Sequence, residues 1–172
     1  MRAIKFIVFA FVLVSTALNA QDVSNIDFHL RDINGDEHSF QEYLAEIRGS
    51  DENPQKGVLF VSFWAMWCKP CKEEMKALVP AFKKLKDKNF HYLAINTDKP
   101  KSIAKVKAYV TSQELPYDFW LDPNSEVFKK LNGQSMPYAL IITETGKVLK
   151  KSVGFIAGDE VEVEEIVSKY LE

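Results

Sequence analysis

The strongest chemical signal in the chain is a pair of cysteines separated by two residues, Cys68-Lys69-Pro70-Cys71. This spacing lets two sulfurs bridge when the segment turns into a helix. A cysteine at the start of a helix also faces unpaired backbone N–H groups, which favour the thiolate and lower its pKa from about 8.5. We therefore expect a redox-active pair in which Cys68 attacks a disulfide and Cys71 resolves the mixed disulfide.

The two residues between the cysteines support this interpretation. Lys69 places a positive charge near Cys68, and Pro70 is tolerated because the first helical turn needs no N–H donor there. A purely structural disulfide is an alternative, although a four-residue loop constrains little of the unfolded chain. A metal site is another, but it would have to recruit histidines that have no ligand spacing to the cysteines: His29, His38 and His91. We expect neither a metal nor another cofactor.

A strand and a helix are predicted to hold the pair. Residues 58–64 (VLFVSFW) are nearly all apolar, which is typical of a central strand buried on both faces. After Cys68, apolar residues recur at helical spacing. Pro80 is expected to kink or end part of that helix.

The remaining elements alternate between strands and helices. Strands are predicted at 26–32, 90–95, 117–121, 138–142 and 148–153, and helices at 39–47, 100–113, 126–131 and from Asp159 onward. Asn34-Gly35 predicts a hairpin turn after the first strand, and 48–56 a polar loop. Asp159 is expected to cap the last helix, with Glu162 as its capping-box partner. This order indicates one α/β domain with a mixed sheet between helices.

Length and composition narrow the class of protein. The chain has 172 residues, of which 47% are hydrophobic and 27% charged, as in ordinary globular domains. The 22 basic and 24 acidic residues give a net charge of −2, which does not favour nucleic-acid binding. Two cysteines are too few for a disulfide-stapled scaffold.

Residues 1–20 have the order of a secretory signal peptide, with a short basic start, nine apolar residues and a small-residue end. Cleavage after Ala20 would leave 21–172 as a single domain. Losing Arg2 and Lys5 leaves 20 basic against 24 acidic residues, a net charge of −4. An uncleaved membrane anchor and a buried first element are the alternatives. Export would place the protein in the periplasm, or at the membrane if the segment is retained, where disulfides persist.

The stretch 61–71 (VSFWAMWCKPC) closely resembles the active-site segment of thioredoxin-fold proteins. Together with the expected hairpin and export, it is similar to the TlpA/ResA branch of bacterial thiol–disulfide oxidoreductases, over roughly 26–171. The resemblance implies a thioredoxin-like fold: a central mixed β-sheet flanked by helices, with an N-terminal β-hairpin and an inserted αβ segment at 99–131.

The resemblance also implies roles for individual residues. Ser135-Met136-Pro137 matches the cis-proline loop of the fold, so Pro137 would be cis beside the sulfurs. Met136 would present its backbone to an extended substrate segment. Trp67 would cover the edge of the thiol site, although its type alone fits a core or surface aromatic equally well.

Two positions depart from the thioredoxin pattern. Ser62 stands where thioredoxins carry a buried acid, and Ala94 where they have a nearby lysine. Another base or water must then take the proton of Cys71. Glu74, where this branch commonly has Glu, is the candidate; a solvated charge on the helix is its alternative reading.

The function implied is that of an exported thiol–disulfide oxidoreductase acting on protein disulfides. We expect a reductant used in cytochrome c maturation or related thiol maintenance, supplied with electrons by a membrane donor of the DsbD or CcdA type. The direction of electron flow between the protein and its substrates depends on the reduction potential of the cysteine pair, which the motif does not set. A peroxide-reducing enzyme and a copper metallochaperone on the same fold are the alternatives.

Overall fold

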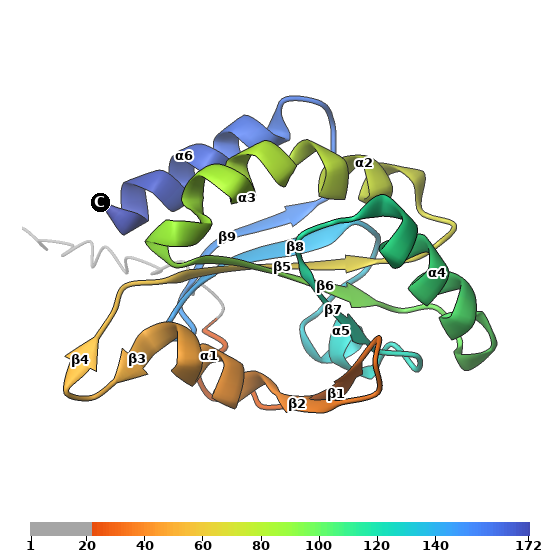
Figure 1. The fold of residues 1–172 in the computed structure, drawn as a ribbon, viewed down its shortest axis with the longest axis horizontal. Helices are drawn as coiled ribbons and strands as arrows, with labels where there is room; N and C mark the ends of the chain where they lie inside the picture. The colour runs from red at the N-terminus through yellow and green to blue at the C-terminus, as the bar shows by residue number, and fades with distance from the viewer. Residues whose placement is uncertain (1–21) are drawn as a thin grey trace, which may run out of the picture.

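A computed structural model describes residues 22–172 (Figure 1). The predicted signal peptide lies outside the described residues. The strands are β1 His29–Asp32, β2 Glu37–Ser39, β3 Gly49–Ser50, β4 Asn53–Pro54, β5 Val58–Trp64, β6 Phe90–Asn96, β7 Asp118–Leu121, β8 Tyr138–Thr143 and β9 Val148–Val153. The helices are α1 Phe40–Arg48, α2 Lys69–Ala77, α3 Val79–Leu85, η1 Lys86–Lys88, η2 Pro100–Ser102, α4 Ile103–Gln113, α5 Glu126–Lys130 and α6 Asp159–Leu171. Of the helices in this part of the chain, none combines the length and apolarity needed to cross a bilayer.

Seven strands form one mixed sheet in the order β2-β1-β7-β6-β5-β8-β9. β5, β6 and β7 run parallel to one another, and the other neighbours pair antiparallel. This confirms the predicted mixed sheet, the N-terminal hairpin β1–β2 and the inserted segment that supplies α4 and β7. Residues 48–56 were predicted to be a polar loop, but part of this segment forms a small antiparallel ribbon of β3 and β4.

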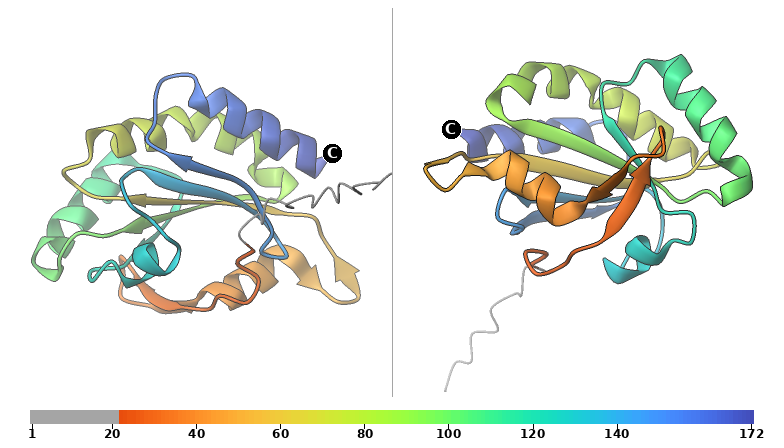
Figure 2. Two further views of the ribbon diagram at one scale, coloured as in Figure 1. Left: turned by 180° about the vertical axis from the view of Figure 1, so that it is seen from behind. Right: turned by 60° about the horizontal axis from the view of Figure 1, so that its bottom comes forward.

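Helices cover both faces of the sheet (Figures 1 and 2). The apolar residues of α2, α3, α4 and α6 pack on one face, and those of α1 and α5 pack on the other. Strand β5 lies in the middle and alternates between the two cores, because successive side chains of a strand point to opposite faces. Val58, Phe60 and Trp64 enter the first core, whereas Leu59, Val61 and Phe63 enter the second.

The helix that carries the cysteines is interrupted where Pro80 was expected to disturb it. α2 ends at Ala77 and α3 begins at Val79, with Leu78 between them. Pro80 lies in the first turn of α3 and has no N–H to donate back to α2. The break lets the two helices follow the sheet separately.

The start of α6 differs from the prediction. Gly158, not Asp159, is the residue that precedes the helix, and no side chain caps it. Gly158 has a φ of 111°, a conformation that glycine adopts readily. Asp159 instead accepts a hydrogen bond from the N–H of Ile156 at 2.9 Å, and Glu162 forms an ion pair with Lys150. The predicted capping box is therefore wrong.

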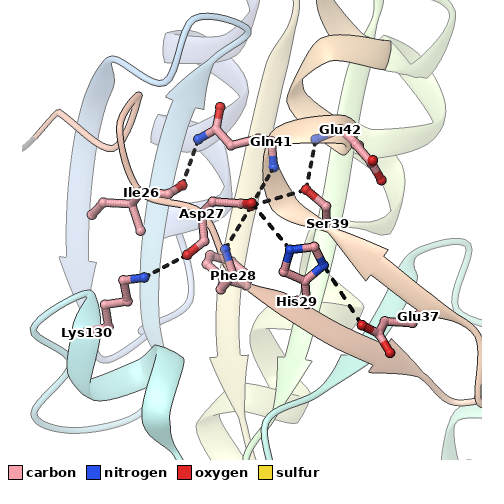
Figure 3. Close-up of polar contacts among 9 residues, drawn as sticks. All are labelled: Ile26, Asp27, Phe28, His29, Glu37, Ser39, Gln41, Glu42 and Lys130. Atoms are coloured by element: carbon pink, nitrogen blue, oxygen red, sulfur yellow. Dashed lines mark hydrogen bonds and ion pairs between the residues drawn. The ribbon is translucent and has the colours of Figure 1, made fainter.

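Polar contacts around Asp27 attach the N-terminal hairpin to α1 and α5 (Figure 3). The Asp27 carboxylate accepts hydrogen bonds from the Phe28 N–H at 2.9 Å, the Ser39 hydroxyl at 3.1 Å and the Gln41 N–H at 3.2 Å. Lys130 of α5 donates to the Asp27 carbonyl at 2.7 Å. Desolvation raises the pKa of Asp27, but these hydrogen bonds outweigh it, so its pKa lies below the usual value.

Candidate active site

Cys68 lies at the end of the loop that joins the central strand β5 to α2, and Cys71 lies in the first turn of α2. Cys68 is the residue that precedes α2, and its Sγ accepts a hydrogen bond from the Cys71 N–H at 3.2 Å. The two cysteines form a disulfide with a Cα–Cα distance of 5.4 Å. The first turn of α2 contains no acidic residue. A sulfur at Cys68 therefore lies at the positive end of a helix, where a thiolate is stabilised.

Access to the pair is asymmetric. Cys68 is 3% exposed and Cys71 is fully buried. Only the first cysteine can therefore present any surface to a substrate in this oxidised state. This difference in exposure agrees with Cys68 as the attacking cysteine and Cys71 as the resolving cysteine, and both roles stay predictions.

The residues around the pair separate into exposed and buried ones. Trp67 is 74% exposed, whereas Trp64 is fully buried in the core. The Lys69 side chain is also exposed and pairs with Glu73 of the same helix at 3.6 Å. Pro70 occupies the first turn of α2, as its missing N–H allows.

The Met136–Pro137 peptide bond is cis, as the resemblance implied. The Pro137 carbonyl accepts a hydrogen bond from the Gly154 N–H at 2.8 Å, which ties this loop to the end of β9. Met136 packs against the core cluster that contains both cysteines. The structure thus brings Met136 to the cysteine site, and the substrate-binding role of the two residues stays a prediction.

Glu74 is buried one turn after Cys71, with 3% of its surface exposed. Its carboxylate accepts hydrogen bonds from the Ser62 hydroxyl and from the Tyr92 hydroxyl, the latter at 3.4 Å. Burial raises the pKa of Glu74 to about 7, against the lowering effect of these two hydrogen bonds, and Asp159 raises it further. The alternative reading of Glu74 as a solvated helix charge is wrong.

Small side chains on the sheet make room for this carboxylate. Ser62 of β5 pairs with Ala94 of β6 and with Ala139 of β8, so three short side chains face α2 side by side. The Glu74 side chain reaches the sheet over this row. A buried acid therefore reaches this row from the helix, whereas the strand itself carries Ser62.

A cavity of about 220 Å³ lies beside Glu74, between β9 and α6. Lys150, Asp159 and Glu162 contribute to its lining together with Glu74. Charged groups from β9 and α6 therefore border the same cavity as the buried carboxylate, and the charge of Asp159 raises the pKa of Glu74.

Two contributors to the site were missed in the sequence. Tyr92 is fully buried and reaches Glu74; its position two residues before Ala94 on the same strand is the signal that places both on one face. Asp98 accepts a hydrogen bond from the Met66 N–H at 2.7 Å. It therefore fixes the loop that leads to Cys68, and no local pattern indicates this long-range contact.

The histidines do not gather at the cysteines. His29 pairs with Asp27 and Glu37, His38 stacks on Trp120, and His91 contacts Asn89. Within residues 22–172, no three His, Cys, Asp or Glu side chains are grouped so that they could hold a metal ion.

Comparison with known proteins identifies the family. Residues 24–151 match the AhpC/TSA family. The chain is 29% identical over 136 residues to "Thiol-disulfide oxidoreductase ResA" of Geobacillus kaustophilus, covering 79% of this chain and 71% of that protein. It is 30% identical over 99 residues to the protein of that name from Bacillus cereus, covering 58% of this chain and 56% of the relative.

Among solved structures, a Chlorobium tepidum protein described as a thiol:disulfide interchange protein, DsbE, has the same fold. The two superpose with a TM-score of 0.71 at 25% identity, over 85% of this chain and 94% of the other. Because the family match spans most of the chain and these relatives share one redox chemistry by name, the chain belongs to the AhpC/TSA family, as a thiol–disulfide oxidoreductase of thioredoxin-like fold.

Proposed function

We propose that the protein is exported and reduces disulfide bonds of other proteins outside the cytoplasm, in cytochrome c maturation or related thiol maintenance. The observation that carries the proposal is the Cys68–Cys71 pair at the start of α2 with the buried carboxyl of Glu74 one turn further on. In this proposal Cys68, just before α2, is the attacking sulfur, and Cys71 and Glu74 within α2 are the resolving sulfur and the proton acceptor.

The reduced protein would act in two steps. The Cys68 thiolate attacks one sulfur of the substrate disulfide, forms a mixed disulfide and releases the other substrate sulfur as a thiolate that takes a proton. Cys71 then loses its proton and attacks Cys68 Sγ, which releases the second substrate thiol. The protein is oxidised to the Cys68–Cys71 disulfide, and the substrate gains two electrons and two protons.

Glu74 is proposed as the group that accepts the proton of Cys71 in the second step. Its pKa of about 7 places it where a carboxylate can both take and return a proton near neutral pH. Ser62 and Tyr92 hold the carboxylate through their hydroxyls and so fix its position over β5 and β6.

The oxidised pair must be reduced again for a further cycle. A membrane donor of the DsbD or CcdA type would supply the two electrons on the outer side of the membrane. The apolar segment in residues 1–20 supports export, and the relatives named ResA support the thiol task. Reduction, and not oxidation, requires that the potential of the pair lie low in the range of CxxC proteins, which spans about −270 to −120 mV.

Reduction of insulin disulfides tests the activity. The dithiol form is expected to reduce insulin, Cys68→Ser to be inactive, and Cys71→Ser to accumulate a mixed disulfide with the substrate. Full activity of Cys68→Ser would refute the assigned nucleophile. An equilibrium with glutathione gives the potential, and a value near −120 mV would make the protein an oxidant.

Two further measurements address the alternatives and the location. Peroxide consumption at a rate above that of insulin reduction would favour a peroxide-reducing enzyme, and copper bound after reducing purification would favour a metallochaperone. Mass spectrometry of the protein from the cell envelope is expected to find a chain that starts at Gln21. A chain that retains residues 1–20 in the cytoplasm would refute export.

A further inference from the structure

A cleft of about 280 Å³ opens beside Trp67, outside the proton-handling site around Glu74. Its lining includes Trp67 from the loop before α2, and Thr97, Asp98, Lys99 and Lys101 from the segment that leads into η2 and α4. The cleft therefore joins the loop that carries the first cysteine to the start of the inserted αβ segment.

Three contacts place this cleft at the edge of the cysteine site. Trp67 is bonded directly to Cys68. Asp98 accepts a hydrogen bond from the Met66 N–H at 2.7 Å, and Thr97 Oγ1 lies 3.6 Å from Met136 Sδ, in the residue before the cis proline. A substrate segment that lies across Cys68 and beside Met136 would therefore bring a residue that neighbours the substrate's own cysteine to this cleft.

Lysines outnumber carboxylates in the lining of the cleft, although acidic residues slightly outnumber basic ones in the whole chain. Lys99 and Lys101 are exposed, and no ion pair among the described residues involves either of them. The one carboxylate in the lining, that of Asp98, uses Oδ2 for hydrogen bonds from Met66 and from the side chain of Asn96. The lining therefore carries two lysines without an ion-pair partner and one carboxylate, a local excess of positive charge, while the chain has a net charge of −2.

We propose that this cleft binds an acidic side chain, Asp or Glu, that flanks the cysteine of a protein substrate's disulfide. The inference rests on the proposed function and names a substrate class for it: disulfides in acidic sequence. The carboxylate of the substrate would lie between the two ammonium groups, and the exposed indole of Trp67 would cover the apolar part of the same side chain or its neighbour. Because the cations are exposed, the attraction is modest and weakens with salt.

A matched set of peptides tests the proposal. Each peptide contains the same intramolecular disulfide with Glu, Gln or Lys at the positions that flank one cysteine, and its reduction by the dithiol form of the protein is followed. We expect kcat/KM for the Glu peptide to exceed that for the Lys peptide about tenfold at low salt, mainly through KM, with the Gln peptide between them. The preference is expected to shrink in 0.5 M salt.

Two variants separate the cleft from the general charge of the surface. The double variant Lys99→Glu with Lys101→Glu is expected to reverse the preference, so that the Lys peptide becomes the better substrate. Lys105→Glu changes an exposed lysine on α4 outside the cleft, and is expected to leave the preference as in the unchanged protein.

The outcomes distinguish this inference from the proposed function. Equal reduction of the Glu and Lys peptides, or an equal reversal by Lys105→Glu, would overturn the acidic cleft and leave the reductase intact. Failure to reduce every peptide and insulin as well would overturn the proposed function itself.

Discussion

The hydroxyl of Ser62 on the central strand donates a hydrogen bond to the carboxylate of Glu74 on the cysteine helix. This contact joins the sheet to α2 in the middle of the protein, where both residues are buried. It also lowers the pKa of Glu74, because a hydrogen bond to the charged form of a carboxylate favours that form against the cost of burial.

Opposite changes in the pKa of Glu74 are expected from two neighbours. Ser62→Ala removes a hydrogen bond that lowers this pKa, so the pKa is expected to rise above about 7. Asp159→Asn removes a negative charge that raises it, so the pKa is expected to fall. NMR titration of the Glu74 side-chain carboxyl measures both. Shifts of the same sign in the two variants would contradict the assigned causes.

The stability of the oxidised protein is expected to depend on pH through Glu74. A folded pKa of about 7 lies above the ordinary glutamate pKa of 4.5, so the stabilising contribution is present below pH 4.5 and is lost as the pH rises through 7. The shift corresponds to about 3 kcal/mol. Glu74→Gln removes this dependence.

The measurement compares urea unfolding of the two proteins at pH 4 and pH 8. Burial lowers the pKa of His91 and gives a trend of opposite sign, but this cancels in the difference between the two proteins. A difference in unfolding free energy that stays constant from pH 4 to pH 8 would argue against the raised pKa.

Glu74→Gln is also expected to slow the release of substrate from the mixed disulfide by about 10²-fold near pH 7, because glutamine cannot take the proton of Cys71. In the unchanged protein this step is expected to speed up as the pH rises through 7, when the carboxyl becomes ionised. Rapid-quench trapping of the mixed disulfide follows the step directly.

The matched control is Glu73→Gln, on the same helix but exposed and paired with Lys69. It removes the same charge without touching the buried site, so the pH dependence is expected to persist. Equal slowing by both variants would show that the charge of α2, and not proton transfer, is responsible.

A buried cap on the opposite face of the sheet offers a test of the fold alone. Asp122 is 2% exposed and accepts hydrogen bonds from the N–H groups of Glu126 and Phe128, each at 2.9 Å. Asp122→Ala is expected to cost about 2 kcal/mol of unfolding free energy, since it leaves the buried N–H of Phe128 and the partly buried N–H of Glu126 without their side-chain acceptor. Exposed Asn124 provides the control, with less than about 0.5 kcal/mol expected for Asn124→Ala. Urea unfolding compares them, and equal losses would contradict the cap.

The local elements were predictable because each depends on neighbours in the chain. The apolar run 58–64 is strand β5, the CxxC spacing places Cys68 at the start of α2, and Asn34-Gly35 forms the hairpin turn. The break before Pro80 follows from a missing N–H. The capping box at Asp159 failed because the φ of Gly158, which a side-chain pattern does not encode, sets how the chain enters α6.

By itself, the sequence determined the pair of sulfurs, the helix that begins directly after Cys68 and the kind of exchange chemistry that these allow. Only the tertiary structure decided that Glu74 is buried, because its environment is built by Ser62, Ala94 and Tyr92 from two other strands. It likewise decided that lysines some thirty residues after the cysteines border the same cleft as Trp67. The physical reason is that burial and charge proximity depend on which distant segments pack together, whereas spacing along the chain fixes only local geometry.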